Sequence, residues 1–124
     1  MRARHTTATA MLDALFKAID AKDAEGFAAF LAPPCEFRFG NLPAVRGRDQ
    51  VKEFVADFLA SIAALSHTID AHWAVPGGLV CHGRVTYTRH DGSTLTVPFA
   101  NVFGLSAEGI ASYLIFADTS QLYA

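Results

Sequence analysis

Apolar and polar positions follow two different periods along this chain, and the change comes near residue 65. Before that point, apolar residues recur three or four positions apart, which predicts helices over residues 8–21 and 48–65. Between them, Asp23 can cap a short helix that Pro33 and Pro34 would end. Residues 35–39, where Glu36 and Arg38 alternate with phenylalanines, are expected to form a short strand.

The second half of the chain alternates with the two-residue period of strands. Strands are expected over residues 66–75, 79–89, 94–105 and 110–118. Three helices followed by a run of strands predict one α+β domain over residues 1–124, with helices covering one face of a curved, mostly antiparallel sheet. Residues 1–6 are expected to form a flexible tail.

Asp91-Gly92 lies between two strand-like segments, which is a strong hairpin signal. A two-residue turn there would pair Arg84 with Phe99 and His82 with Asn101. One face of the hairpin would then carry His82, Arg84, Thr86, Thr88, Leu95, Val97, Phe99 and Asn101. The opposite, apolar face would carry Cys81, Gly83, Val85, Tyr87, Thr96, Pro98, Ala100 and Val102. This division predicts a pocket on the first face and packing on the second.

Composition narrows the function classes. Hydrophobic residues make up 52% of the chain and charged residues 18%, a balance that favours self-association. The net charge of −2 gives no electrostatic reason to expect nucleic-acid or membrane binding. Cys35 and Cys81 lack metal-ligand spacing and are expected to be reduced and buried, so neither a metal nor another cofactor is predicted. No signal peptide is recognisable, and a cytoplasmic protein is expected.

Three segments resemble a known family: Asp20–Phe27, Gly47–Phe54 and Val97–Asp118. They are similar to the SnoaL-like polyketide cyclase and ketosteroid isomerase branch of the nuclear transport factor 2-like superfamily. The resemblance spans nearly the whole chain. It implies a cone-shaped fold with three N-terminal helices, and homodimers that form sheet to sheet.

The resemblance can be examined position by position. The general-base carboxylate of ketosteroid isomerases corresponds to Phe39 here, their oxyanion tyrosine to Leu15, and their protonated aspartate to Asn101. Ketosteroid isomerisation by that mechanism is therefore not expected. The acid–base aspartate of the polyketide cyclases corresponds to Asp118, which makes the cyclase pattern the better match.

Three residues are the catalytic candidates. His82 carries an imidazole, a group that can take a proton from the carbon next to a carbonyl or return one. Asn101 can donate its amide to an enolate oxygen. Asp118 is the alternative proton carrier, although strand parity points it outward if Tyr113 and Ile115 face the pocket. A structural interpretation stays open for His82 and Asn101, because a core histidine can be satisfied by the amide opposite it.

The predicted binding residues are Arg84, Phe99, Phe103, Tyr113, Phe39 and Phe58. Arg84 would meet either an anionic substrate or an internal carboxylate such as Glu36 or Asp118, because a lone buried guanidinium is costly. The sequence thus suggests a cofactor-independent lyase or isomerase for a small apolar carbonyl compound. The alternatives are a non-catalytic small-molecule-binding domain and a dimeric adaptor with a vestigial pocket.

Overall fold

The computed structural model describes residues 2–123, with side chains from Thr9 onward. The helices are α1 (Arg2–Asp20), α2 (Ala24–Ala28) and α3 (Arg48–Ala60). The strands are β1 (Leu31–Phe39), β2 (Val45–Arg46), β3 (Ala64–Val75), β4 (Gly78–Thr88), β5 (Thr94–Ser106) and β6 (Gly109–Ala117).

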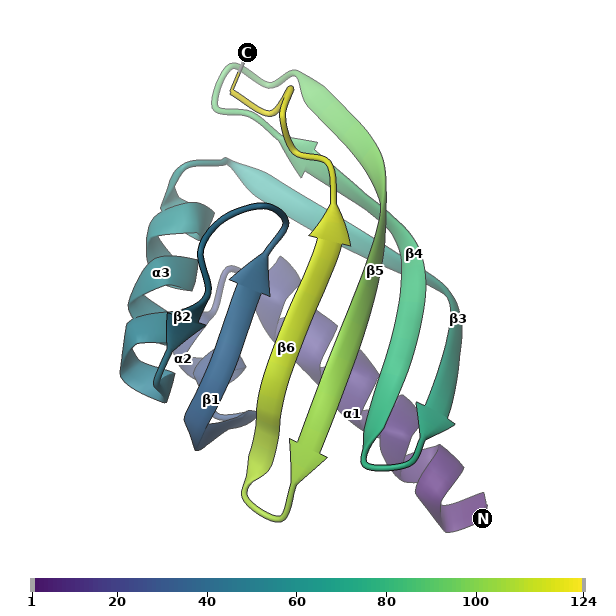
Figure 1. Ribbon diagram of the computed structural model, residues 1–124. Coiled ribbons are helices and arrows are strands. Elements are labelled where there is room, and N and C mark those ends of the chain that lie inside the picture. The colour runs from purple at the N-terminus through teal and green to yellow at the C-terminus, as the bar shows by residue number, and fades with distance from the viewer. Residues whose placement is uncertain (1, 124) are drawn as a thin grey trace.

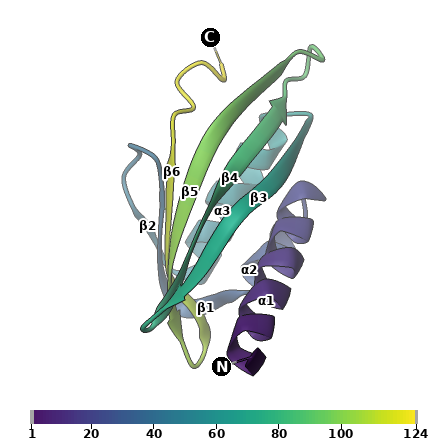
Figure 2. The same cartoon turned by 90° about the vertical axis from the view of Figure 1, so that its right-hand side faces the viewer.

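The strands form one sheet in the order β2-β1-β6-β5-β4-β3. Only the β1–β6 pairing is parallel. The sheet is twisted and curved, and all three helices lie on one side of it, with α1 crossing behind β3 to β6 (Figure 1). The side view shows the two layers and places the two ends of the chain at opposite ends of the molecule (Figure 2). The predicted α+β fold, with helices on one face of a curved mixed sheet, is confirmed.

The core lies between the helices and the face of the sheet that meets them, here called the inner face. Strand alternation puts every second side chain on that face. The helices contribute Leu12, Leu15, Phe16, Phe27, Val51, Val55 and Leu59, and the strands contribute Phe37, Leu65, Leu79, Val85, Tyr87, Phe99, Phe103, Ile110 and Tyr113, all buried. The other side of the sheet, the outer face, has no layer of described residues over it.

The hairpin between β4 and β5 does not have the predicted turn. Gly92 N donates to Arg89 O (2.9 Å) and Arg89 N to Ser93 O (2.8 Å), so the loop has three residues, with Gly92 at φ +89°. This is a turn followed by a left-handed glycine, not a two-residue Asp-Gly turn. The extra residue shifts the pairing by one position, and a shift of one turns side chains to the other face.

The shift overturns half of the predicted inner face. Gly83 pairs with Phe99, Cys81 with Asn101, and Arg84 with Pro98. The β5 assignment was right, because Leu95, Val97, Phe99 and Asn101 do point inward. The β4 assignment was wrong. Cys81, Gly83, Val85 and Tyr87 point inward, and His82, Arg84, Thr86 and Thr88 point outward.

A bulge in β3 adds a second change of phase. Ile69 pairs with Gly83 but Ala71 with His82, so Asp70 is an extra residue. Gly83 makes the bulge possible: a Cβ there would lie 1.8 Å from Thr68 O. Beyond the bulge the alternation is reversed, which puts Trp73 on the outer face although Ile69 faces inward.

Several boundaries differ from expectation. Helix α1 begins at Arg2, before the expected residue 8; that residues 1–6 form a flexible tail stays a prediction. Helix α3 ends at Ala60, because Ala63 N already bonds to Thr88 O and starts the sheet. Strand β1 begins at Leu31, and its pairing with β6 is irregular over the prolines, which lack an N–H to donate. Strand β2 was not predicted.

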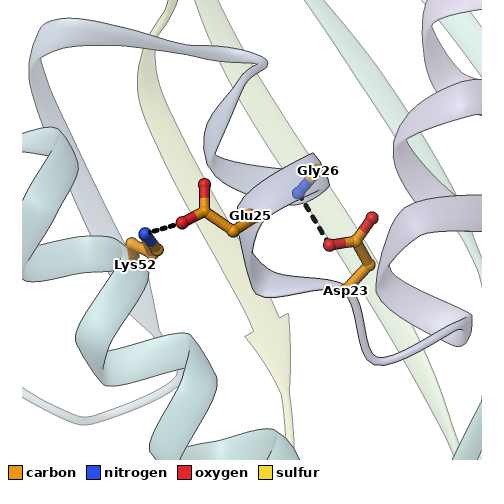
Figure 3. Close-up of polar contacts among 4 residues, drawn as sticks. All are labelled: Asp23, Glu25, Gly26 and Lys52. Carbon is orange, nitrogen blue, oxygen red and sulfur yellow. Dashed lines mark hydrogen bonds and ion pairs between the residues drawn. The ribbon is translucent and has the colours of Figure 1, made fainter.

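The short helix α2 connects the other two helices. Asp23 caps it as predicted, accepting from Gly26 N (2.9 Å), and Glu25 forms an ion pair with Lys52 of α3 (Figure 3). Lys22 precedes this cap in the left-handed conformation (φ +58°) and donates from Nζ to Ile62 O (2.8 Å). These contacts fix the chain immediately after the last residue of α1, Asp20.

Candidate functional site

An apolar cavity of about 50 Å³ lies between the helices and the inner face. Its wall is rich in aromatic rings: Phe27, Phe37, Phe39, Phe54, Phe58, Tyr87, Phe99 and Tyr113. No Lys or Arg is among the described residues that line it. The cavity therefore suits an uncharged, largely apolar molecule, because nothing in the wall would offset the desolvation of an anion.

Five of the residues singled out from the sequence are in this wall: Phe39, Phe58, Phe99, Asn101 and Tyr113. A sixth, Phe103, is buried behind the wall with its ring 4.6 Å from that of Tyr113. Burial raises the pKa of the phenols of Tyr87 and Tyr113, so both remain protonated and can donate a hydrogen bond at neutral pH.

His82 and Arg84 are not in the cavity. The ring of His82 stacks on Trp73 on the outer face, with centroids 5.6 Å apart. The guanidinium of Arg84 pairs with the bulged Asp70 at 3.1 Å, where both side chains are exposed. The expectation that these residues share an inner-face pocket with Phe99 is wrong, because it depended on the two-residue turn.

Asp118 follows the last strand and is also outside the cavity. Its side chain is exposed, and Ser120 N donates to its Oδ1 at 3.0 Å. Hydrogen bonds from the Ser120 hydroxyl and N–H hold the pKa of Asp118 below its usual range. The outward orientation that strand parity suggested is the one observed.

Apart from tyrosines and cysteines, Asn101 is the one polar side chain that is fully buried among the described residues, with 2% of its surface exposed. Its Oδ1 has no hydrogen-bond partner among those residues. A buried polar atom left without a partner costs about 1–3 kcal/mol. Since an apolar residue here would avoid that cost, the amide is better explained by a ligand or water in the cavity than by the stability of the fold.

A second polar group in the cavity wall, His67 of β3, was not singled out from the sequence. Its Nδ1 is 2.6 Å from Asp20 Oδ1, and its backbone N donates to Asp20 Oδ2 at 2.9 Å. The ring also contacts Phe16 (4.7 Å between centroids) and Phe99 (5.2 Å, edge to face). Among the described residues no hydrogen bond reaches its other ring nitrogen, Nε2.

A signal for His67 was present in the sequence. It alternates with Leu65 and Ile69, so it occupies the apolar phase of its strand and had to face inward with them. Asp20, by contrast, could not have been assigned to it. The two residues are 47 positions apart, and only the packing of α1 on β3 brings them together.

The cavity thus combines an imidazole, an amide and two phenols within apolar walls. This set can take up or return a proton and can donate hydrogen bonds to an oxygen that gains negative charge. Among the described residues no group of three or more His, Cys, Asp or Glu side chains is placed to hold a metal ion. No described helix is long and apolar enough to cross a membrane.

A comparison with models of known protein families gives a match over most of the chain. A model described as a SnoaL-like domain matches residues 12–113. Curated protein sequences give no match.

Solved structures match over most of the chain. One, from Jannaschia sp. CCS1, is provisionally described as a SnoaL-like polyketide cyclase and has 17% identity and a TM-score of 0.80. The match covers 94% of this chain and 89% of that chain. A nuclear transport factor 2-like protein of unknown function from Burkholderia pseudomallei has 19% identity and TM-score 0.81, with 92% of each chain covered. A hypothetical protein from Catenulispora acidiphila with a ketosteroid isomerase-like fold, in complex with trimethylamine, has 16% identity and TM-score 0.77, with 85% and 82% covered. At these identities the likeness concerns the fold.

Proposed function

The chain belongs to the SnoaL-like domain family, and from that premise we propose that it is a cofactor-independent lyase or isomerase for a small, neutral carbonyl compound. One observation carries the proposal: His67 and Asn101 open on the same apolar cavity. The first is an imidazole, whose ring nitrogens can accept and donate a proton, and the second is a buried amide whose oxygen has no partner among the described residues.

The chemistry is a proton transfer next to the carbonyl. Neutral His67 takes the proton from the carbon beside the carbonyl. The electron pair of the broken C–H bond forms a C=C bond to the carbonyl carbon, and the π pair of the C=O bond moves onto the oxygen to give an enolate. The amide N–H of Asn101 makes no hydrogen bond to another described residue and donates to that oxygen; the partnerless Oδ1 is an acceptor and takes no part in this step. The C=O bond then re-forms. In an enone the electrons of the extended enolate take the proton from the imidazolium at the far carbon, which is an isomerisation. In a β-hydroxy carbonyl compound they break the C–O bond at the β carbon, and the imidazolium gives its proton to the departing oxygen, which is an elimination. The apolar walls strengthen both interactions by excluding water.

Hydrogen exchange tests this step without knowledge of the product. A panel of small ketones and enones is first screened for raising the melting temperature. The compounds that bind are then followed by NMR in D2O for exchange at the carbon beside the carbonyl. The protein should accelerate exchange, and His67→Gln should lower the rate by about 10²–10⁴-fold. His82→Gln, on the outer face, is the matched control and should exchange like the wild type.

The result that contradicts the proposal is equally definite. If every compound that binds exchanges no faster with the wild type than with His67→Gln, the catalytic assignment fails.

A non-catalytic binding domain is the second candidate, and the aromatic wall favours it. Aromatic faces attract small alkylammonium ions, and no Lys or Arg in the wall would repel such an ion. The Catenulispora acidiphila protein of similar fold holds trimethylamine. A thermal shift with trimethylammonium or a neutral ketone, without exchange, would support this function. If no compound raises the melting temperature, the remaining candidate is a dimeric adaptor with a vestigial pocket.

We also propose a homodimer formed through the outer face. Trp73 on β3 and Phe116 on β6 are 52% and 57% exposed there, and Val75, two residues after Trp73 on β3, is exposed as well. Exposed apolar groups gathered on one sheet face are typical of interaction surfaces. The buried Tyr87, expected on this surface, is in the core instead.

A further inference from the structure

Both oxygens of the Asp20 carboxylate contact the same residue, His67. Oδ2 accepts from the backbone N–H at 2.9 Å, and Oδ1 is 2.6 Å from Nδ1 of the ring. From this geometry we infer that Asp20 is a positioning residue: it holds the neutral His67 ring in the tautomer with the proton on Nδ1, which leaves the lone pair on Nε2 to accept a proton. The role of Nε2 as a base rests on the proposed function, whereas the assignment of the tautomer does not depend on that function.

The tautomer follows from what each group can do. An ionised carboxylate only accepts hydrogen bonds, so the nitrogen facing it must carry a proton. In a neutral imidazole only one nitrogen is protonated, and Nε2 is then the acceptor. The side chains of Asp20 and His67 are only 28% and 11% exposed, so water competes little for this contact.

The rings around His67 restrict it further. Phe16 lies 4.7 Å away in a tilted arrangement, and Phe99 lies 5.2 Å away, edge to face. Neither ring offers a conventional donor or acceptor to the imidazole. Rotation of the ring would thus exchange the Asp20 contact for an apolar one, which fixes its orientation as well as its tautomer.

The position of Asp20 is a poor one for helix stability. It is the last residue of α1, where the helix carbonyls already carry partial negative charge and a carboxylate is unfavourable. Its contact with the backbone N–H explains one oxygen, because β3 is an edge strand and that N–H would otherwise lack a partner. The ring contact of the second oxygen is left to explain, and positioning His67 does so.

Asp20→Asn separates the structural contact from the positioning role. The backbone N–H of His67 can only donate, so the amide oxygen of the new side chain must face it. The amide NH2 then faces Nδ1 and donates to it. Nδ1 must therefore become the acceptor, and the proton moves to Nε2. The edge contact survives, while the tautomer is reversed.

The measurement is 15N NMR of the histidine rings at a pH where His67 is neutral, with its signals identified by their loss in His67→Gln. The wild type should show the Nδ1–H tautomer, and Asp20→Asn the Nε2–H tautomer with an otherwise unchanged backbone spectrum. The matched control is Asp70→Asn, an aspartate that pairs with Arg84 on the outer face. It should leave the His67 signals unchanged.

Two results would overturn the inference: a wild type with the proton on Nε2, or an Asp20→Asn variant that keeps the proton on Nδ1. The wild-type spectrum decides the first point even if the variant does not fold. If exchange activity is found, Asp20→Asn should lower kcat by at least tenfold with little change in KM, since it alters the base and not the walls. A reversed tautomer in a protein without exchange activity would support the positioning and refute the proposed function.

Discussion

His67 and His82 lie on neighbouring strands, β3 and β4, but on opposite faces of the sheet. The inner-face ring is held by a carboxylate between two phenylalanines and borders an apolar cavity. The outer-face ring stacks on an exposed tryptophan. Their chemistry in isolation is identical. Whether an imidazole can serve as a site is decided here by the partner that orients it and by the cavity it reaches, and both depend on strand register.

The largest effect is expected when a charged residue is introduced on each face of the sheet in turn. Val85 is 1% exposed on the inner face, and its neighbour Thr86 is half-buried on the outer face. Val85→Asp buries an unpaired carboxylate and should cost more than about 4 kcal/mol, enough to prevent folding. Thr86→Asp should change stability by less than about 1 kcal/mol. Urea denaturation measures both, and equal effects would refute the observed register.

A smaller effect on stability is expected from replacing Asn101, whose Oδ1 has no partner among the described residues. Asn101→Leu replaces a buried polar group by an apolar one of similar size, so the ligand-free protein should gain about 1–3 kcal/mol of stability. Ligand-induced thermal shifts should weaken at the same time. Asn41→Leu, in an exposed loop, is the matched control and should do neither. If Asn101→Leu loses stability, the amide is a structural element and its role in the cavity has to be abandoned.

The fold could be read from the sequence because it depends on signals that are redundant. The helix stripe of Leu12, Leu15 and Phe16 and the alternation in the strands each predict the same layers, and an error of a few residues at one boundary changes nothing. Helix α3 ended five residues early and the architecture was still right.

The site could not be read as completely, because it depends on signals that are not redundant. One additional residue in the loop at Gly92 turned His82 and Arg84 outward. The Asp20–His67 contact is tertiary, with nothing in either segment to specify the other. Asn101 was placed on the inner face correctly, because the β5 half of that face did not depend on which turn joined it to β4.

The outer face should control assembly without affecting the cavity. Phe116→Lys places a charge in the proposed contact, and light scattering should then give the 13.3 kDa of one chain in place of twice that mass. Ligand-induced thermal shifts should be unchanged. Lys17→Ala on an exposed position of α1 is the control. A wild type that is already monomeric at micromolar concentration would refute the dimer.

The mildest change is an engineered disulfide between β4 and β5, which tests the register of these two strands directly. Thr86 and Thr96 face each other on the outer face, with hydroxyl oxygens 2.8 Å apart. A Thr86→Cys/Thr96→Cys variant should therefore oxidise to a disulfide, because directly opposed strand residues hold their Cβ atoms close enough for the two sulfur atoms to bond. In Thr86→Cys/Val97→Cys, which the two-residue turn would have paired, the thiols point to opposite faces and should stay reduced.

The native cysteines should not interfere with that experiment. Burial raises the pKa of Cys81 to about 11 and also raises that of Cys35, so little of either thiol is the reactive thiolate at pH 8. Thiol titration before and after mild oxidation should show the loss of two thiols in Thr86→Cys/Thr96→Cys and of none in the wild type. A disulfide in the Thr86→Cys/Val97→Cys variant alone would restore the two-residue turn, and with it His82 as the histidine of the inner face.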